Sequence, residues 1–208
     1  MDFVVIASTG GAVLENLLNN EFFRDRIRCV VSDRECGAID VASKFGVPYK
    51  IFYAADGLVF SNFLLNEFRY CAPDLFVSFY TRLFRGEFIS FANHRLVNMH
   101  PSILPAFPGS DGFGGAIRYG AKFVGATIHV VDEGMDTGFP IIQGSIPLDP
   151  QRSESEVRHL VFQQQCKMLL QLITWVDQKR LVFNRRGQPI ISGAKYELGE
   201  FSPNLEIR

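Results

Sequence analysis

Short apolar stretches alternate with helical patterns in the N-terminal part of the chain, and this order restricts the fold more than any other feature of the sequence. Residues 3–7 and 27–32 have the length and composition of buried strands, whereas residues 13–23 and 38–45 have helical patterns. A chain that alternates strand and helix builds a parallel sheet with helices on its faces. The sequence therefore predicts an α/β fold.

The alternation continues beyond this region. A helical pattern over residues 58–70 leads into an apolar strand at 75–79, and two further strands are expected at 126–131 and 140–143. We predict a doubly wound, mostly parallel sheet with helices on both faces and a Rossmann-like N-terminal half.

A last helix is expected to begin with acidic residues near Ser153 and to run to about Lys179, with bases in its last turn, as the helix dipole prefers. Residues 184–208 are polar and contain Gly and Pro, which predicts an irregular tail or a pair of edge strands. We therefore expect one domain over residues 1–183, with the tail packed on the same domain.

One segment is too rich in Pro and Gly for regular structure. Residues 101–115 contain three prolines and four glycines, which disfavour both helix and strand. A long irregular loop in a compact domain is usually functional. This segment is therefore expected to contribute to a site.

Charge and composition restrict the class of ligand. The net charge is -1, with acidic and basic residues mixed along the chain, so neither a nucleic acid nor a membrane surface is an expected partner. The apolar stretch at residues 3–7 is too short to span a bilayer. The four cysteines and four histidines show no spacing typical of metal ligands. We expect a reduced, cytoplasmic protein that binds small molecules and no metal.

Three polar features lie where strands are expected to end. Asn98 and His100 are two residues apart in a segment that Pro101 biases toward extended geometry, so both side chains point to one side. An amide and an imidazole can then stabilise one oxyanion. Asp136 could favour a charged imidazole and relay a proton. Taken singly, each feature also fits a turn with satisfied side chains, and His129 fits a core position.

Taken together, these features resemble a known family. Residues 98–109 read Asn-Met-His-Pro-Ser-Ile-Leu-Pro-Ala-Phe-Pro-Gly, which is similar to the signature of folate-dependent formyltransferases, in particular those that act on glycinamide ribonucleotide. Residues 125–138 resemble the family's Gly-x-Thr-x-His segment and the acidic loop that follows it. The resemblance covers most of the chain and implies the formyltransferase fold.

The resemblance implies a transfer of the formyl group of 10-formyltetrahydrofolate, the co-substrate, to an amine, with glycinamide ribonucleotide of purine biosynthesis as the family's usual acceptor. It implies Asn98, His100 and Asp136 as catalytic residues, with His129 supporting Asp136. The implied folate-binding residues are Arg82, Leu83, Phe84, Val131, Asp132, Glu133 and Gly134, and the implied substrate-binding residues are Gly10, Gly11, Ala12, Val13, Met99, Pro101, Asp111 and Gln165. For the oligomeric state, a homodimer is left open.

The sequence departs from the family on the acceptor side. Ala12 and Val13 replace a Ser and an Asn in the turn that holds the substrate phosphate, and Gln165 replaces a Glu. Asp111 stands where the family has a histidine-containing segment, and an acid there would repel Asp136 or attract a cationic acceptor. The acceptor could therefore be another amine, such as an amino sugar.

Three other functions are weighed against formyl transfer. Hydrolysis of formyltetrahydrofolate would use the same catalytic domain. A nicotinamide-dependent oxidoreductase is suggested by Gly10, Gly11 and Asp33, but the full GxGxxG motif is missing. A folate binder without activity is disfavoured because the catalytic side chains are all present.

Overall fold

The chain divides into two structural units in the computed structural model, which describes residues 1–206. Unit 1 comprises Met1–Asn98 and Val131–Gly134. Unit 2 comprises Met99–Val130 and the residues from Met135 onward. The tail that follows residue 183 is part of unit 2, and the domain boundary expected at that residue stays a prediction.

Unit 1 is built on parallel strands, as the alternation in the sequence predicts. The strand order is β5-β4-β1-β2-β3, and every neighbouring pair is parallel. The chain thus adds strands on one side of β1 and then crosses back to add β4 and β5 on the other. The strands are β1 (Phe3–Ala7), β2 (Ile27–Ser32), β3 (Tyr49–Ile51), β4 (Leu75–Phe79) and β5 (Leu96–His100), whose last two residues belong to unit 2.

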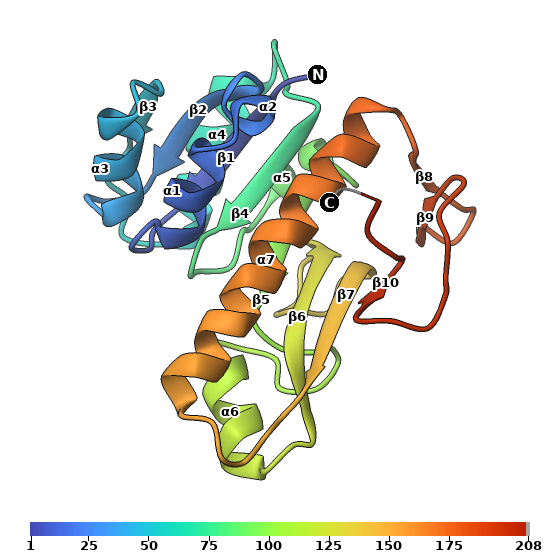
Figure 1. Cartoon of the computed structure of the whole chain (residues 1–208). Helices are drawn as coiled ribbons and strands as arrows, with labels where there is room; N and C mark the ends of the chain where they lie inside the picture. The colour runs from blue at the N-terminus through green and yellow to red at the C-terminus, as the bar shows by residue number, and fades with distance from the viewer. Residues whose placement is uncertain (207–208) are drawn as a thin grey trace. The chain divides into compact units, whose positions relative to one another are not determined.

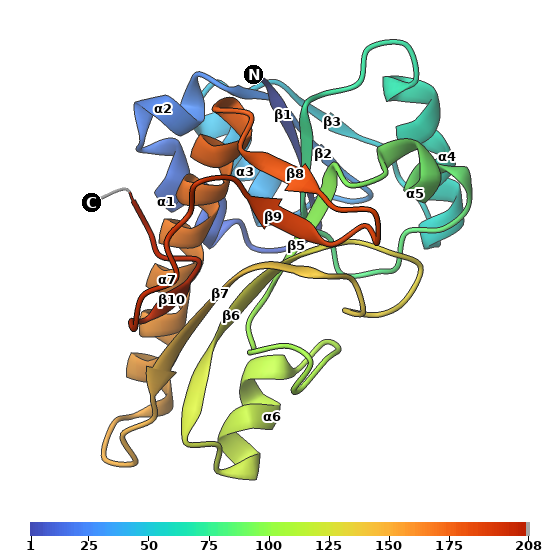
Figure 2. The same cartoon turned by 90° about the vertical axis from the view of Figure 1, so that its right-hand side faces the viewer.

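Helices cover both faces of this parallel sheet, which confirms the predicted α/β fold class (Figure 2). On one face α1 packs against α3, and on the other α4 packs against α5. The expected helix over residues 13–23 is two helices, because the side chain of Asn20 accepts a hydrogen bond from Phe23 N and starts a new one. The helices are α1 (Ala12–Leu18), α2 (Glu21–Arg24), α3 (Gly37–Lys44), α4 (Gly57–Phe68) and α5 (Glu87–Ala92).

Aromatic side chains fill the core between the sheet and the helices α4 and α5. Phe60, Phe76 and Phe88 are fully buried, and the rings of Phe76 and Phe88 meet edge to face at 5.3 Å. Such rings bury large apolar areas and prefer this geometry. The packing holds the polypeptide segments that leave the carboxyl end of β4.

Unit 2 contains an antiparallel sheet in which β6 (Phe123–Val130) pairs with β7 (Pro140–Pro147). The long helix α7 (Glu154–Asp177) packs along both strands (Figure 1). The tail adds β10 (Phe201–Ser202) to the edge of β7, and β9 (Pro189–Ile191) pairs with β8 (Leu181–Phe183). Among residues 1–206, no helix has the length and apolar character needed to cross a membrane.

Two expectations about helices are wrong. Residues 101–115 are not irregular throughout, because α6 (Gly112–Tyr119) begins within them and buries Phe113 and Ala116. Burial of this apolar face outweighs the low helix propensity of its glycines. The last turn of α7 holds no basic residue, since the helix ends at Asp177 and Lys179 lies beyond it with φ +58°.

The expected start of α7 with acidic residues in its first turn is confirmed, and the structure adds a capping box there. Ser153 Oγ accepts from Glu156 N at 3.3 Å, and Glu156 Oε2 accepts from Ser153 N at 2.8 Å. Because Ser153→Ala removes one of these bonds, it should lower the free energy of unfolding by about 1 kcal/mol in urea titrations. Ser192→Ala, at an exposed position after β9 and away from the cap, is the control and should change it by less than about 0.5 kcal/mol. Equal effects of the two substitutions would contradict a role for the box.

Candidate active site

The carboxylate of Asp136 is the centre of a buried polar cluster in unit 2. His100 Nδ1 lies 3.3 Å from Asp136 Oδ2, and His129 Nε2 lies 3.5 Å from Oδ1. The backbone N–H of Gly109 donates to Oδ2 at 2.7 Å. The side chains of Asp136, His100 and His129 are 11%, 5% and 3% exposed. Two imidazoles and one amide therefore converge on a single carboxylate.

One face of strand β6 positions this cluster. Thr127 and His129 are two residues apart on the strand, so both side chains lie on one face, and both are buried. Thr127 Oγ1 donates to Ser102 O at 2.8 Å and accepts from Leu104 N at 3.0 Å. These bonds fix the loop that follows His100, while His129 on the same face reaches Asp136.

The loop then returns to His100 and determines its ring orientation. Ser102 Oγ donates to the carbonyl of Ala106 at 2.6 Å, and His100 Nε2 lies 2.8 Å from the carbonyl oxygen of Phe107. A carbonyl can only accept, so Nε2 must carry a proton. Nδ1 faces the Asp136 carboxylate, which accepts as well. A ring protonated on both nitrogens would thus donate at both ends.

Asp136 is held as a carboxylate by its neighbours. Burial alone would raise the pKa of this carboxyl, but three opposing effects outweigh it. The hydrogen bond from His129, the N–H of Gly109 and the charges on His100 and His129 hold the pKa of Asp136 below its ordinary value of 3.8. The backbone at Asp136 has φ +55°, a left-handed conformation that Asp and Asn tolerate better than most residues.

Close contact with His100 explains why α6 begins with glycine. A methyl group on Gly112 would overlap His100 Nε2 and the Phe107 carbonyl. A methyl group on Gly114 would overlap the carboxylate of Asp111 in the same way. Glycine is needed at position 112 because the helix backbone must approach the imidazole. Gly112 is therefore a packing requirement of this cluster.

Unit 1 contains Asn98 and the implied folate-binding residues. Asn98 lies half-buried in β5, in register with Ser78 of β4. Arg82, Leu83 and Phe84 follow β4 in an irregular segment, and their backbone N–H and C=O groups make no hydrogen bond within residues 1–206. Arg82 and Leu83 line an open cavity of about 520 Å³. Unpaired backbone groups beside a cavity are suited to a ligand that both donates and accepts.

The second implied folate segment also lies in unit 1. Val131 N donates to Leu96 O at 2.8 Å, which places the start of this segment beside β5. Asp132 Oδ1 accepts from Gly134 N at 3.1 Å and forms a turn. Asp132 and Glu133 are exposed, whereas Val131 and Gly134 are half-buried.

The implied substrate-binding residues fall into both units. In unit 1, Gly10, Gly11, Ala12 and Val13 line a cavity of about 210 Å³ in the first strand-to-helix turn. In unit 2, Met99 is buried, Pro101 and Gln165 are half-buried, and Asp111 is exposed. The Asp111 carboxylate accepts from Arg118 Nη2 at 2.5 Å, so its charge has a partner on α6.

Four residues of the cluster escaped the sequence analysis: Phe107, Gly109, Gly112 and Thr127. Phe107 and Gly109 act through backbone atoms, which leave no signal in side-chain chemistry. The two glycines lie in the Pro- and Gly-rich run, so their positions were visible but their contacts were not. Across the part of the chain that the structure describes, no set of three or more His, Cys, Asp or Glu side chains is placed to hold a metal ion.

Comparison with known proteins decides the family. The sequence profile described as formyl transferase matches residues 1–173. The chain belongs to the formyl transferase family. It is 36% identical to a phosphoribosylglycinamide formyltransferase of Mycobacterium tuberculosis over 156 residues, covering 70% of each protein. It is 31% identical to that of Bacillus subtilis over 194 residues, covering 89% of this chain and 97% of the relative.

A solved structure agrees with this assignment. The crystal structure of glycinamide ribonucleotide transformylase 1 from Symbiobacterium toebii superposes with a TM-score of 0.82 at 27% identity. It covers 92% of this chain and 93% of the solved one. This formyltransferase therefore has the α/β fold of its relatives, and it is an enzyme of the formyltransferase class.

The lowered pKa of Asp136 predicts how stability depends on pH. A carboxyl whose native pKa is lowered stabilises the fold above its ordinary pKa, and this contribution is lost as the pH falls through the native value. Asp136→Asn keeps the shape and the tolerance of positive φ but not the charge. At about pH 5 it should lower the free energy of unfolding by about 1 kcal/mol, and the difference should shrink toward about pH 3. A difference that grows on acidification in urea titrations would contradict this.

The fit of Gly112 against His100 predicts a selective effect of one methyl group. Gly112→Ala should displace the imidazole and change the NMR shifts of the His100 ring nitrogens. Gly115→Ala in the same helix is the control, because its methyl group would meet Phe107 Cδ1 at an ordinary 3.4 Å. This control should leave the ring shifts unchanged and stabilise the helix by about 0.5 to 1 kcal/mol. Equal ring shifts in both variants would contradict the close approach.

Proposed function

We propose that this formyltransferase transfers the formyl group of 10-formyltetrahydrofolate to the amine of glycinamide ribonucleotide. The observation that carries the proposal is the carboxylate of Asp136, held in unit 2 by His100, His129 and Gly109. A buried, ionised carboxylate next to an imidazole can stabilise charge and accept a proton, and formyl transfer to an amine needs both.

His100 would stabilise the oxyanion. When an amine attacks the formyl carbon, the carbonyl oxygen gains negative charge, and donors fixed in advance lower the energy of this state. Of the two ring contacts of His100, the one from Nδ1 to Asp136 is the longer, at 3.3 Å, and Nε2 is held at 2.8 Å by Phe107 O. Nδ1 is therefore the nitrogen that can turn to a substrate oxygen. Asn98, two residues earlier in the chain, is proposed as the second donor.

Asp136 would handle the amine proton. Attack places a positive charge on the amine nitrogen, and the bond between the formyl carbon and the folate nitrogen then breaks. The departing nitrogen must gain a proton as the amine loses one, so a carboxylate can relay it, directly or through one water. A pKa of Asp136 held below its ordinary value keeps the group ready to accept at neutral pH. His129 would hold the carboxylate in place at 3.5 Å.

The folate is proposed to bind along Arg82–Phe84 and 131–134. A pterin ring has donors and acceptors on one edge, which the unpaired backbone groups of Arg82, Leu83 and Phe84 complement. The cavity of about 520 Å³ beside Arg82 and Leu83 offers additional room. No metal is part of this proposal.

The turn after β1 favours a second candidate acceptor besides glycinamide ribonucleotide. The residues that line its cavity offer a phosphate no charged side chain; they are Thr9, Gly10, Gly11, Ala12, Val13, Leu14, Ala38 and Phe79. Backbone N–H groups could still bind a phosphate there. An amine that places no phosphate in this turn, such as an amino sugar, is the alternative acceptor.

The test is a formylation assay with mass spectrometry. With 10-formyltetrahydrofolate, the wild-type enzyme should add one formyl mass to glycinamide ribonucleotide, and His100→Ala should reduce turnover by about a hundredfold. His159→Ala, an exposed histidine on α7, is the matched control and should keep full activity. Formylation of another amine instead would favour the alternative acceptor. Release of formate without any acceptor would indicate hydrolysis, and near wild-type turnover in His100→Ala would refute the mechanism.

A further inference from the structure

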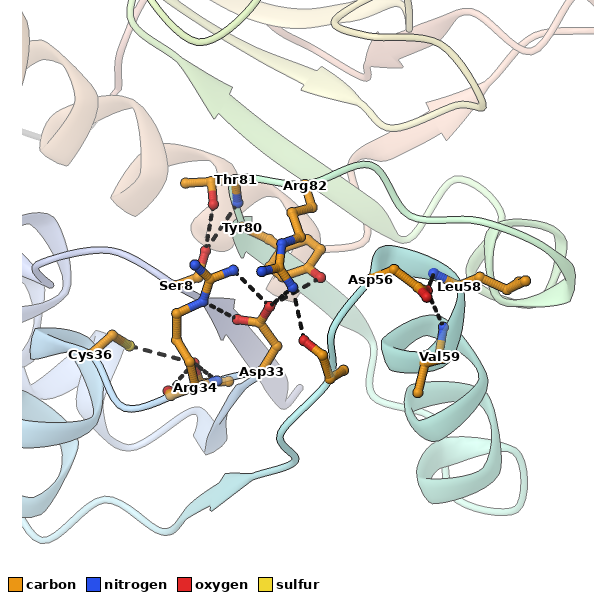
Figure 3. Close-up of polar contacts among 12 residues, drawn as sticks. Ser8, Asp33, Arg34, Cys36, Asp56, Leu58, Val59, Tyr80, Thr81 and Arg82 are labelled. Carbon is orange, nitrogen blue, oxygen red and sulfur yellow. Dashed lines mark hydrogen bonds and ion pairs between the residues drawn. The ribbon is translucent and has the colours of Figure 1, made fainter.

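Asp33 forms a second buried carboxylate centre, in unit 1 and apart from the chemistry described above. It follows β2, and its side chain is completely buried. Arg34 donates to both of its oxygens at 2.8 Å, and Arg82 Nη1 donates to Oδ2 at 2.7 Å (Figure 3). Tyr80 Oη adds a longer bond at 3.4 Å. One carboxylate thus joins the end of β2 to the segment that follows β4.

A buried carboxylate with these partners is a rigid connection. Removing an ion from water is costly unless its oxygens are paired, and both oxygens of Asp33 are paired here. Burial and the charge of Asp33 together raise the pKa of Tyr80 to about 12, so this phenol keeps its proton and donates. Loss of both arginines would leave the charge uncompensated, so the geometry is strongly preferred.

Arg82 also connects Asp33 to the backbone of a neighbouring segment. Its Nη1 also donates to the carbonyl of Ala54 at 2.9 Å, and Ala54 N in turn donates to Asp33 O at 3.3 Å. Arg82 therefore lies between two fixed points, and only 36% of its side chain is exposed. Its guanidinium is engaged by the protein itself.

The neighbouring residues are held in the same way. Thr81 N donates to Ser8 Oγ at 3.1 Å, and Arg85 N donates to the fully buried Ser61 Oγ at 3.0 Å. The carbonyl of Leu83 approaches Gly57 so closely that a methyl group there would overlap it. The segment is thus fixed at both ends and at its centre, while the backbone groups of Arg82, Leu83 and Phe84 have no hydrogen-bond partner within residues 1–206.

We propose that Asp33 is a positioning residue for the folate: through Arg82 it holds the unpaired backbone groups of Arg82–Phe84 in the geometry that receives the pterin. This inference rests on the proposed function for the identity of the ligand. Pre-ordering these groups lowers the entropic cost that binding would otherwise meet. Asp33 acts at a distance, so it should affect folate affinity and leave the chemical step alone.

Arg34 provides an internal comparison. It pairs with the same carboxylate through two bonds, but it precedes α3, and within residues 1–206 its side chain makes no hydrogen bond to the Arg82–Phe84 segment. If Asp33 had only a structural role, losing Arg34 and losing Arg82 would have similar effects. If Asp33 positions the folate segment, only the loss of Asp33 or Arg82 should matter for the ligand.

The first arm of the test needs no ligand. Hydrogen exchange of the backbone amides of Thr81 and Arg85, both bonded in the native segment, reports its opening. In Asp33→Asn and in Arg82→Met, these amides should exchange about tenfold faster than in the wild type, while Arg34→Gln should change them by less than about twofold. Arg82→Lys, which keeps a charged donor, should restore protection. Arg82→Met keeps the test valid if Asp33→Asn does not fold.

The second arm measures the full enzyme at steady state. In Asp33→Asn and Arg82→Met, the KM for 10-formyltetrahydrofolate should rise about tenfold, with kcat and the KM for the amine within about twofold. Arg34→Gln should match the wild type, and Arg82→Lys should recover most of the folate affinity. A fall in kcat with unchanged folate KM would overturn the positioning role.

The two arms separate the outcomes. Unchanged amide exchange in Asp33→Asn and Arg82→Met overturns the ordering of the Arg82–Phe84 segment by Asp33, whatever the enzyme binds. Faster exchange together with no folate turnover in the wild type refutes the proposed function but supports the ordering of the segment by Asp33. Equal effects of Arg34→Gln and Arg82→Met in both arms would reduce Asp33 to a structural residue and overturn the inference.

Discussion

The shared carboxylate of Asp136 is the interaction on which the candidate active site depends. His100, His129 and the Gly109 amide all converge on it, and each comes from a different stretch of unit 2. A carboxylate that accepts three donors keeps its charge despite its burial, because the favourable interactions outweigh the loss of water. The loop after His100 must therefore fold back far enough for Gly109 to reach it. The bonds from Thr127 and the contact at Gly112 hold that loop against β6 and α6.

The carboxylates of Asp33 and Asp136 have different partners and suit different tasks. Asp33 is paired with arginines, whose charge is permanent at any physiological pH, so the connection it makes is static. Asp136 is paired with two imidazoles, whose ring nitrogens can either donate or accept a hydrogen bond, so its surroundings can change during a reaction. A permanent ion pair fits the task of holding a segment in place, and an imidazole pair fits the task of moving protons.

The Pro- and Gly-rich run contains glycine for a physical reason that the sequence did not reveal. Such a run is expected to be irregular and mobile, since glycine has a large conformational freedom to lose. Here Gly112 opens α6 because no side chain fits between the helix backbone and the imidazole of His100. The carboxylate of Asp111 is bound by Arg118, and its expected effect on Asp136 or on a cationic acceptor stays a prediction. Glycine thus serves close packing at this end of the helix.

The sequence alone determined the fold class, the family and the three side chains that meet in the polar cluster, those of His100, His129 and Asp136. Strand and helix periods are local properties, and the signature around His100 and Asp136 consists of neighbouring residues, so both are legible without coordinates. Only the tertiary structure decided that Phe107 and Gly109 complete the cluster and that Arg82 is tied to Asp33 rather than free. These contacts join backbone atoms, or residues far apart in the chain, and they depend on the path of a loop. No pattern of side-chain types encodes that path, because a carbonyl or an amide is the same at every residue.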